Sequence, residues 1–216
     1  MSFVRVAVFL ALVAVTAGAC GSHATSISPT DPNARRIVVL GDSLAVTPSR
    51  NESFPAVLQT RINERGLHWV VTNAGISGDT TSGGLRRVDA LLRDDVGVIV
   101  LALGANDGLQ HVDLSTIEQN LSSIIEKARR RGVDVLLCGM ETLPGRDLEY
   151  PIAFHTIFPR LAGKYDLPLV PFLLLGVALN PSLNGSDGVH PNAAGARRIA
   201  DNVWPYLEPL LTPTSN

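Results

Sequence analysis

The chain has 216 residues, of which 45% are hydrophobic and 18% charged, a size and composition typical of one compact domain with a short extension. Its 18 basic and 20 acidic residues give a formal charge of −2, which argues against binding to nucleic acid or to an anionic membrane surface. The two cysteines, Cys20 and Cys138, cannot form a disulfide framework, and no Cys/His cluster indicates structural zinc.

The first 19 residues have the pattern of a signal peptide. Only Arg5 is charged, an apolar run extends from Val6 to Val15, and small residues follow as far as Ala19. The run is about ten residues long, half of what a transmembrane helix needs. We therefore expect residues 1–19 to be removed and the protein to be exported.

Cys20 lies directly after the predicted cleavage point. Ala17-Gly18-Ala19-Cys20 resembles a bacterial lipobox, although Ala stands where the first residue is usually Leu. We predict that Cys20 is lipidated and that the mature protein is a cell-envelope lipoprotein; the alternative is a soluble periplasmic or secreted protein. Residues 20–35 then form the lipidation site and a flexible tether, because they are rich in Ser, Thr and Pro and show no periodicity.

Residues 36–216 alternate between strand and helix patterns. Short apolar runs of the kind buried on both faces of a parallel sheet occur at 37–40, 69–71, 96–103, 133–137 and 167–170. Apolar residues recur at helical spacing in the segments 54–62, 85–92, 114–128, 151–165 and 191–207. The alternation predicts a three-layer α/β/α domain with a parallel sheet of about five strands and a site at the carboxyl ends of the strands.

Polar residues collect in four loops at that edge of the predicted sheet. Ser43 follows the first strand, Gly78 follows the second, Asn106 follows the third, and Asp187 and His190 precede the last helix, which we expect to begin at Pro191. These are the residue types of an acyl-transfer site.

A serine hydroxyl is a weak nucleophile until a base activates it. We expect Ser43 to be the nucleophile, His190 its base, and Asp187 the carboxylate that orients the imidazole. The backbone N–H groups of Ser43 and Gly78 and the side-chain amide of Asn106 are candidate oxyanion donors. Asp187 and His190 fall short of a zinc site because no third ligand is near them in the sequence.

At these residues the sequence resembles the GDSL, or SGNH, hydrolase family. The family's four marks are matched by Gly41-Asp42-Ser43-Leu44, Gly78, Gly104-Ala105-Asn106-Asp107 and the pair Asp187 and His190, in the family's order. The closest resemblance is to its exported thioesterase, lysophospholipase and arylesterase subgroup. It implies a flavodoxin-like sheet and a serine hydrolase that needs neither metal nor cofactor and acts on small acyl esters or thioesters, and we expect a monomer.

Some alternatives stay open. The enzyme could remove O-acetyl groups from carbohydrate, or the chain could be a binding lipoprotein that keeps the fold without the catalysis. The loop Ala45-Val46-Thr47-Pro48 is bulkier than is usual in the family, which weakens any conclusion about substrate. The apolar stretch Phe172–Val177 fits either the core or the wall of an acyl-chain site.

Overall fold

The computed structural model describes residues 34–142 and 148–212. The predicted signal peptide, Cys20 and nearly all of the predicted tether lie outside the described residues. The described part is built on one parallel sheet with the strand order β2-β1-β3-β4-β5. Its strands are β1 (Arg35–Gly41), β2 (Trp69–Asn73), β3 (Val96–Ala102), β4 (Asp134–Cys138) and β5 (Leu169–Val170).

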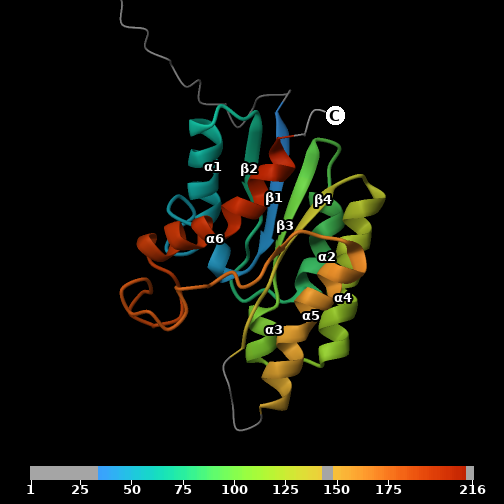
Figure 1. The fold of residues 1–216 in the computed structure, drawn as a ribbon, viewed down its shortest axis with the longest axis vertical. Helices are drawn as coiled ribbons and strands as arrows, with labels where there is room; N and C mark the ends of the chain where they lie inside the picture. The colour runs from blue at the N-terminus through green and yellow to red at the C-terminus, as the bar shows by residue number, and fades with distance from the viewer. Residues whose placement is uncertain (1–33, 143–147, 213–216) are drawn as a thin grey trace, which may run out of the picture.

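Helices cover both faces of the sheet (Figure 1). They are α1 (Phe54–Glu64), α2 (Thr81–Leu91), α3 (Ala105–Leu109), α4 (Leu114–Arg130), α5 (Glu149–Tyr165) and α6 (Ala193–Leu211). Helices α1 and α6 pack together on one face, and α2, α4 and α5 form a row on the other. The predicted three-layer α/β/α fold is therefore confirmed. No helix of the described ranges is long and apolar enough to cross a bilayer.

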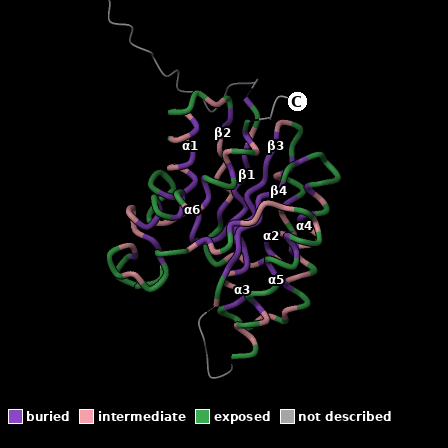
Figure 2. Tube along the Cα trace, in the orientation of Figure 1, coloured by how far each residue is buried: buried purple, intermediate pink, exposed green. Residues whose placement is uncertain are grey.

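The core lies between the sheet and the two helical layers, as the buried central strands show (Figure 2). All seven residues of β3 are buried, which accounts for a strand sequence that is apolar throughout apart from Gly97. On the α5 side, the buried rings of Phe154 and Phe158 meet edge to face with their centroids 5.5 Å apart. This continuous apolar packing fixes the sheet on which the polar loops stand.

The strand order places a change of direction between β1 and β3. The chain moves from β1 outward to β2, then crosses back over β1 to reach β3 on its other side. Loops that leave neighbouring strands in opposite directions open a crevice at the carboxyl edge, where α/β proteins usually bind their ligands. The loops after β1, β2 and β3 all lie at this edge.

Several helix ends differ from the sequence prediction by a few residues, and the starts of α2 and α6 differ for identifiable reasons. Helix α2 begins at Thr81, although its apolar stripe starts only at Leu85, because the side chain of Thr80 accepts a hydrogen bond from the Gly83 N–H and caps the helix. Pro191 does not begin α6, as we had expected, because it forms an antiparallel bridge with Asn184. The N-cap is Asn192, whose side chain accepts from the N–H groups of Ala194 and Gly195.

Candidate active site

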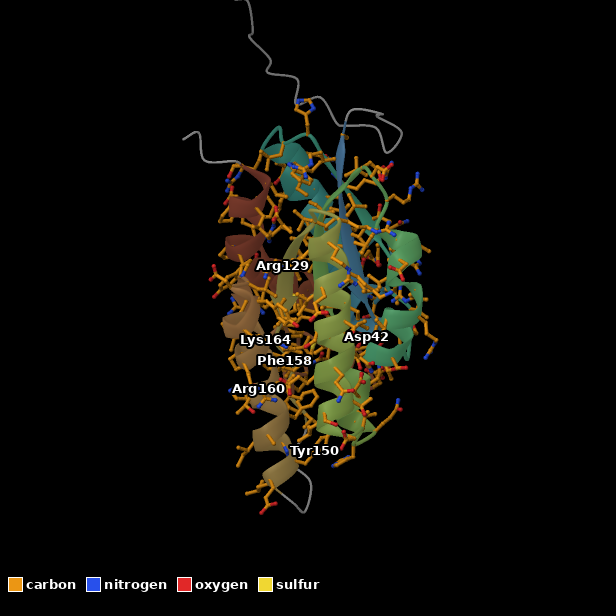
Figure 3. The ribbon with its side chains drawn as sticks, turned by 90° about the vertical axis from the view of Figure 1, so that its right-hand side faces the viewer. Asp42, Arg129, Tyr150, Phe158, Arg160 and Lys164 are labelled. Atoms are coloured by element: carbon orange, nitrogen blue, oxygen red, sulfur yellow. The ribbon has the colours of Figure 1, made fainter. Side chains whose placement is uncertain are left out.

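The loop after β1 places Ser43 at the first position of a 3-10 turn, Ser43–Ala45. Asp42 caps this turn, since its Oδ1 accepts from the Leu44 N–H at 2.9 Å. Figure 3 labels Asp42 near the carboxyl end of β1, and its side chain is almost completely buried. Burial raises the pKa of Asp42 to about 6, with a smaller rise from the nearby Asp79 charge, while the Leu44 N–H acts in the opposite direction.

Three of the predicted residues form one hydrogen-bonded chain. The Oγ of Ser43 lies 3.0 Å from Nε2 of His190, and Nδ1 of His190 lies 2.7 Å from Oδ2 of Asp187. An ionised carboxylate can only accept a hydrogen bond, so Nδ1 carries the imidazole proton and Nε2 is left to accept from the Ser43 hydroxyl. The structure therefore brings the Ser43, His190 and Asp187 side chains together in the order that the sequence predicts.

The carboxylate of Asp187 is stabilised in its charged form. Its Oδ1 accepts from the backbone N–H groups of His190 and Val189, both at 3.0 Å, while its Oδ2 contacts the imidazole. The backbone bond to His190, then the side-chain bond to His190 and the backbone bond to Val189, lower the pKa of Asp187 well below its usual range. The carboxylate is thus held in its ionised form, which fits its role as acceptor toward Nδ1 of His190.

Backbone pairing holds the His190 loop in place. The Gly185 N–H donates to the His190 carbonyl at 2.8 Å, and the bridge between Asn184 and Pro191 closes the loop behind it. The amide of Asn192 donates to the carbonyls of Ser182 and Asn184. These contacts, rather than a helix start at Pro191, place the imidazole above Ser43.

The predicted oxyanion donors lie on the loops at the same edge of the sheet, but they differ in the hydrogen bonds that they already make. Gly78 has a φ of 76°, a left-handed conformation that favours glycine. In the described ranges the backbone N–H groups of Ser43 and Gly78 donate to no backbone carbonyl. The Asn106 amide, by contrast, donates to the Asp79 carbonyl at 2.9 Å and to Oδ2 of Asp42 at 3.3 Å. Substrate binding must therefore compete with the longer of these two bonds.

Asp107 is a buried carboxylate whose role was not predicted from the sequence. It lies in the short helix α3, which was also not predicted, directly after Asn106. Its two oxygens accept from the backbone N–H of Thr81 at 2.9 Å and from the Thr81 hydroxyl at 2.6 Å, and Asn120 donates to that hydroxyl. The contact between Asp107 and Thr81 therefore joins the start of α2 to the loop that carries Asn106. The sequence contains no signal for this contact, since an Asp in a glycine-rich loop is usually exposed.

Exposed apolar side chains occur on three of the four site loops. Ile76, Leu109 and Val189 are each about half exposed, and they lie close in sequence to Gly78, Asn106 and His190. In the stretch Phe172–Val177, Leu173 and Val177 belong to the core, one of the two predicted roles, whereas Leu175 is exposed. Cys138 is a fully buried thiol, and burial raises its pKa.

A surface hollow of the described domain lacks the groups for acyl transfer. This surface hollow of about 520 Å³ lies at the opposite edge of the sheet and contains none of the predicted residues; it is lined by Asp89, Leu92, Arg93, Asp94, Asp95 and Arg131. Within the described ranges no three His, Cys, Asp or Glu side chains are placed to hold a metal ion.

Comparisons with known proteins agree with the fold and with the loop motifs. Residues 39–198 match the model of the GDSL-like lipase/acylhydrolase family. The chain is 39% identical to Esterase TesA of Pseudomonas aeruginosa over 82% of this chain and 90% of the relative. It is 35% identical to thioesterase 1/protease 1/lysophospholipase L1 of Escherichia coli over 83% of this chain and 86% of the relative.

The solved structures show the same relationship. A crystal structure of TesA superposes with a TM-score of 0.78 at 38% identity, covering 82% of this chain and all of that one. Sequence and structure thus agree across most of the described domain, and the predicted resemblance is confirmed: this chain belongs to the GDSL-like lipase/acylhydrolase family.

Proposed function

We propose that the protein is a serine hydrolase that cleaves small-molecule carboxylic esters or thioesters through an acyl-enzyme. The observation that carries the proposal is the continuous hydrogen-bonded chain from Ser43 through His190 to Asp187, with contacts of 3.0 and 2.7 Å. Ser43 and His190 are 147 positions apart in the sequence, so this contact is a product of the fold. Relatives that carry the names esterase, thioesterase and lysophospholipase support the same reaction class.

The first half of the reaction acylates the serine. Nε2 of His190 takes the hydroxyl proton as Oγ of Ser43 attacks the carbonyl carbon, and Asp187 stabilises the imidazolium that forms. The negative charge on the carbonyl oxygen is stabilised by the N–H groups of Ser43 and Gly78 and by the Asn106 amide. The imidazolium then gives its proton to the departing alcohol or thiol, which leaves Ser43 esterified.

The second half frees the serine. Water, deprotonated by His190, attacks the acyl carbonyl, and the proton returns from the imidazolium to Oγ of Ser43 as the acid leaves. Exposed apolar side chains on three of the site loops, Ile76, Leu109 and Val189, favour substrates whose acyl or alcohol part is apolar.

Two experiments test this proposal together. A fluorophosphonate probe should label the wild-type protein at one site, and Ser43→Ala should lose both the label and the hydrolysis of p-nitrophenyl esters. A panel of esters of increasing acyl length, an acyl thioester and an acetylated sugar then defines the substrate class. A wild-type protein that is folded, unlabelled and inactive on the whole panel would refute the proposal and leave a binding protein as the better description.

We also propose that the enzyme works at the cell envelope, anchored through Cys20. The support is the sequence alone: an apolar leader that ends in small residues before Cys20. Intact-mass analysis of the exported protein should show an acylated N-terminal Cys20, and Cys20→Ser should release a soluble form. An unmodified mature chain in the wild type would contradict the anchor without affecting the hydrolase proposal.

A further inference from the structure

One guanidinium group contacts three acceptors on two segments that lead to the candidate active site. Arg87, in the second half of α2, donates from Nη2 to the Gly41 carbonyl at 3.0 Å and from Nη1 to the Ala74 carbonyl at 2.5 Å. Its Nε donates to Oδ2 of Asp79 at 2.8 Å. Gly41 lies two residues before Ser43, and Asp79 directly follows Gly78. The guanidinium therefore contacts the last residue of β1, two positions before the nucleophile, and the loop after β2 next to an oxyanion donor.

Asp79 extends this connection to the loop after β3. While its side chain pairs with Arg87, its carbonyl accepts from the Asn106 amide at 2.9 Å. Its remaining side-chain oxygen accepts from the Thr80 N–H. The side chains of Arg87 and Asp79 are only 20% and 11% exposed, so water competes weakly for these bonds. All three proposed oxyanion donors are thus linked through one ion pair.

The position of Asp79 depends on a glycine in the first turn of α2. A Cβ on Gly83 would lie 1.7 Å from Oδ1 of Asp79, so any larger residue there would displace the carboxylate. The start of α2 is itself fixed, because Asp107 accepts from the Thr81 N–H and hydroxyl. Helix α2 is therefore held at its first turn and holds the loops through Arg87.

We propose that Arg87 is a positioning residue for ester hydrolysis, one that sets the relative placement of Ser43, the Gly78 N–H and the Asn106 amide. This inference rests on the proposed function. A guanidinium suits the task because its donors form a planar fork in fixed directions, whereas the ammonium of Lys would reach only one or two of the three acceptors. Preorganised donors act on the charge of the transition state, so loosening them lowers kcat more than it raises KM.

The chain offers a matched control in the adjacent residue. Arg86 lies on the same helix with the same charge, but the bond recorded for it runs to the Ser82 hydroxyl within α2. We expect Arg87→Ala to lower kcat for a p-nitrophenyl ester by about 10- to 100-fold with KM changed less than about threefold, because small displacements of catalytic groups have effects of this size. Arg86→Ala should match the wild type, and Arg87→Lys should fall between.

Two further measurements separate positioning from loss of folding. Each kcat is divided by the number of sites that the fluorophosphonate labels at completion, so that unfolded molecules are not counted. Added guanidinium at millimolar concentration should partly restore Arg87→Ala and have no such effect on Arg86→Ala; as a denaturant, it cannot restore an unfolded variant. Gly83→Ala, which displaces Asp79 and leaves Arg87 in place, should show the same loss of kcat.

The outcomes are distinguishable. If the wild type is labelled and active while Arg87→Ala and Gly83→Ala keep kcat per labelled site within about threefold, the positioning role is wrong and the proposed hydrolase stands. If kcat per labelled site falls but guanidinium restores nothing and Arg87→Lys equals Arg87→Ala, the fork geometry is not what matters, and the inference also fails. A wild type that is neither labelled nor active would instead overturn the proposed function itself.

Discussion

Replacing Asp187 by Asn is the sharpest test of the candidate triad, because it changes one atom of the carboxylate. In the wild type, Oδ1 accepts from two backbone N–H groups, and Oδ2 accepts from Nδ1 of His190 at 2.7 Å. The Asp187→Asn side chain would keep the oxygen that holds the loop and present an N–H where Oδ2 was. Nδ1 would then have to accept, so the ring proton would move to Nε2, the atom that must receive the proton of Ser43.

The size of the effect follows from this change of tautomer. Without a free lone pair on Nε2, the base is lost, and the positive charge that forms on the ring is no longer stabilised by a carboxylate. Removing the carboxylate in this way costs about 10⁴-fold in kcat in a serine protease triad, or about 5.5 kcal/mol of activation free energy. We expect a loss of that order here. Stability should change little, because the Asp187 side chain is 52% exposed and its loop contacts are kept.

The assay is hydrolysis of a p-nitrophenyl ester under saturating conditions, with thermal unfolding as the control for folding. Asp187→Ala provides a comparison, since it removes both the carboxylate and the two loop bonds. If Asp187→Asn retains more than about a tenth of the wild-type kcat, Asp187 is not the partner of the catalytic imidazole, and the reasoning from the 2.7 Å contact is refuted.

Three predictions concern stability. Burial raises the pKa of Asp42 to about 6, so the unfolded state ionises first and this group lowers the free energy of unfolding as pH rises from about 4 to about 6. In urea unfolding, Asp42→Asn should remove up to about 3 kcal/mol of the decrease over that pH range. Wild-type and Asp42→Asn curves of unfolding free energy against pH that run parallel would contradict this prediction. Phe158→Ala should cost about 3–5 kcal/mol by the same measurement, because the ring is 1% exposed, and a loss below about 1 kcal/mol would show that the core closes around it. Gly163→Ala should instead add about 0.5–1 kcal/mol, since a Cβ there meets no atom within 4 Å, and any destabilisation would be inconsistent with that open space.

The sheet could be predicted because its central strands are buried on both faces. The segment Val96–Leu103 is apolar throughout apart from one Gly, which few structures other than a central parallel strand require, and the observed β3 covers Val96–Ala102. Helix ends were less predictable. The stripe in α2 begins at Leu85, but the helix begins at Thr81 because its start is set by hydrogen bonds to Thr80 and to the distant Asp107.

The candidate site likewise contains residues that the sequence pattern predicts and residues that only the folded structure reveals. The groups proposed to touch substrate, such as Ser43 and His190, belong to short motifs whose residue types suggest their chemistry. Arg87 belongs to no such motif, because its partners are backbone carbonyls and one carboxylate in loops that only the fold brings near α2. The prediction that Pro191 begins α6 was wrong for a related reason. Proline suits the first turn of a helix, but here Pro191 forms a bridge with Asn184, a partner that the sequence pattern does not indicate.

The wide separation of Ser43 and His190 has a consequence for the newly made protein. Strand β1 is among the first elements to be synthesised, and the imidazole comes from the loop just before α6, the last helix of the described domain. A nascent or truncated chain can therefore display the serine long before a base can reach it. Such a chain is unable to attack lipids or other esters that it meets during synthesis or transport. With His190 as the proposed base, turnover of ester begins only when the C-terminal segment has docked.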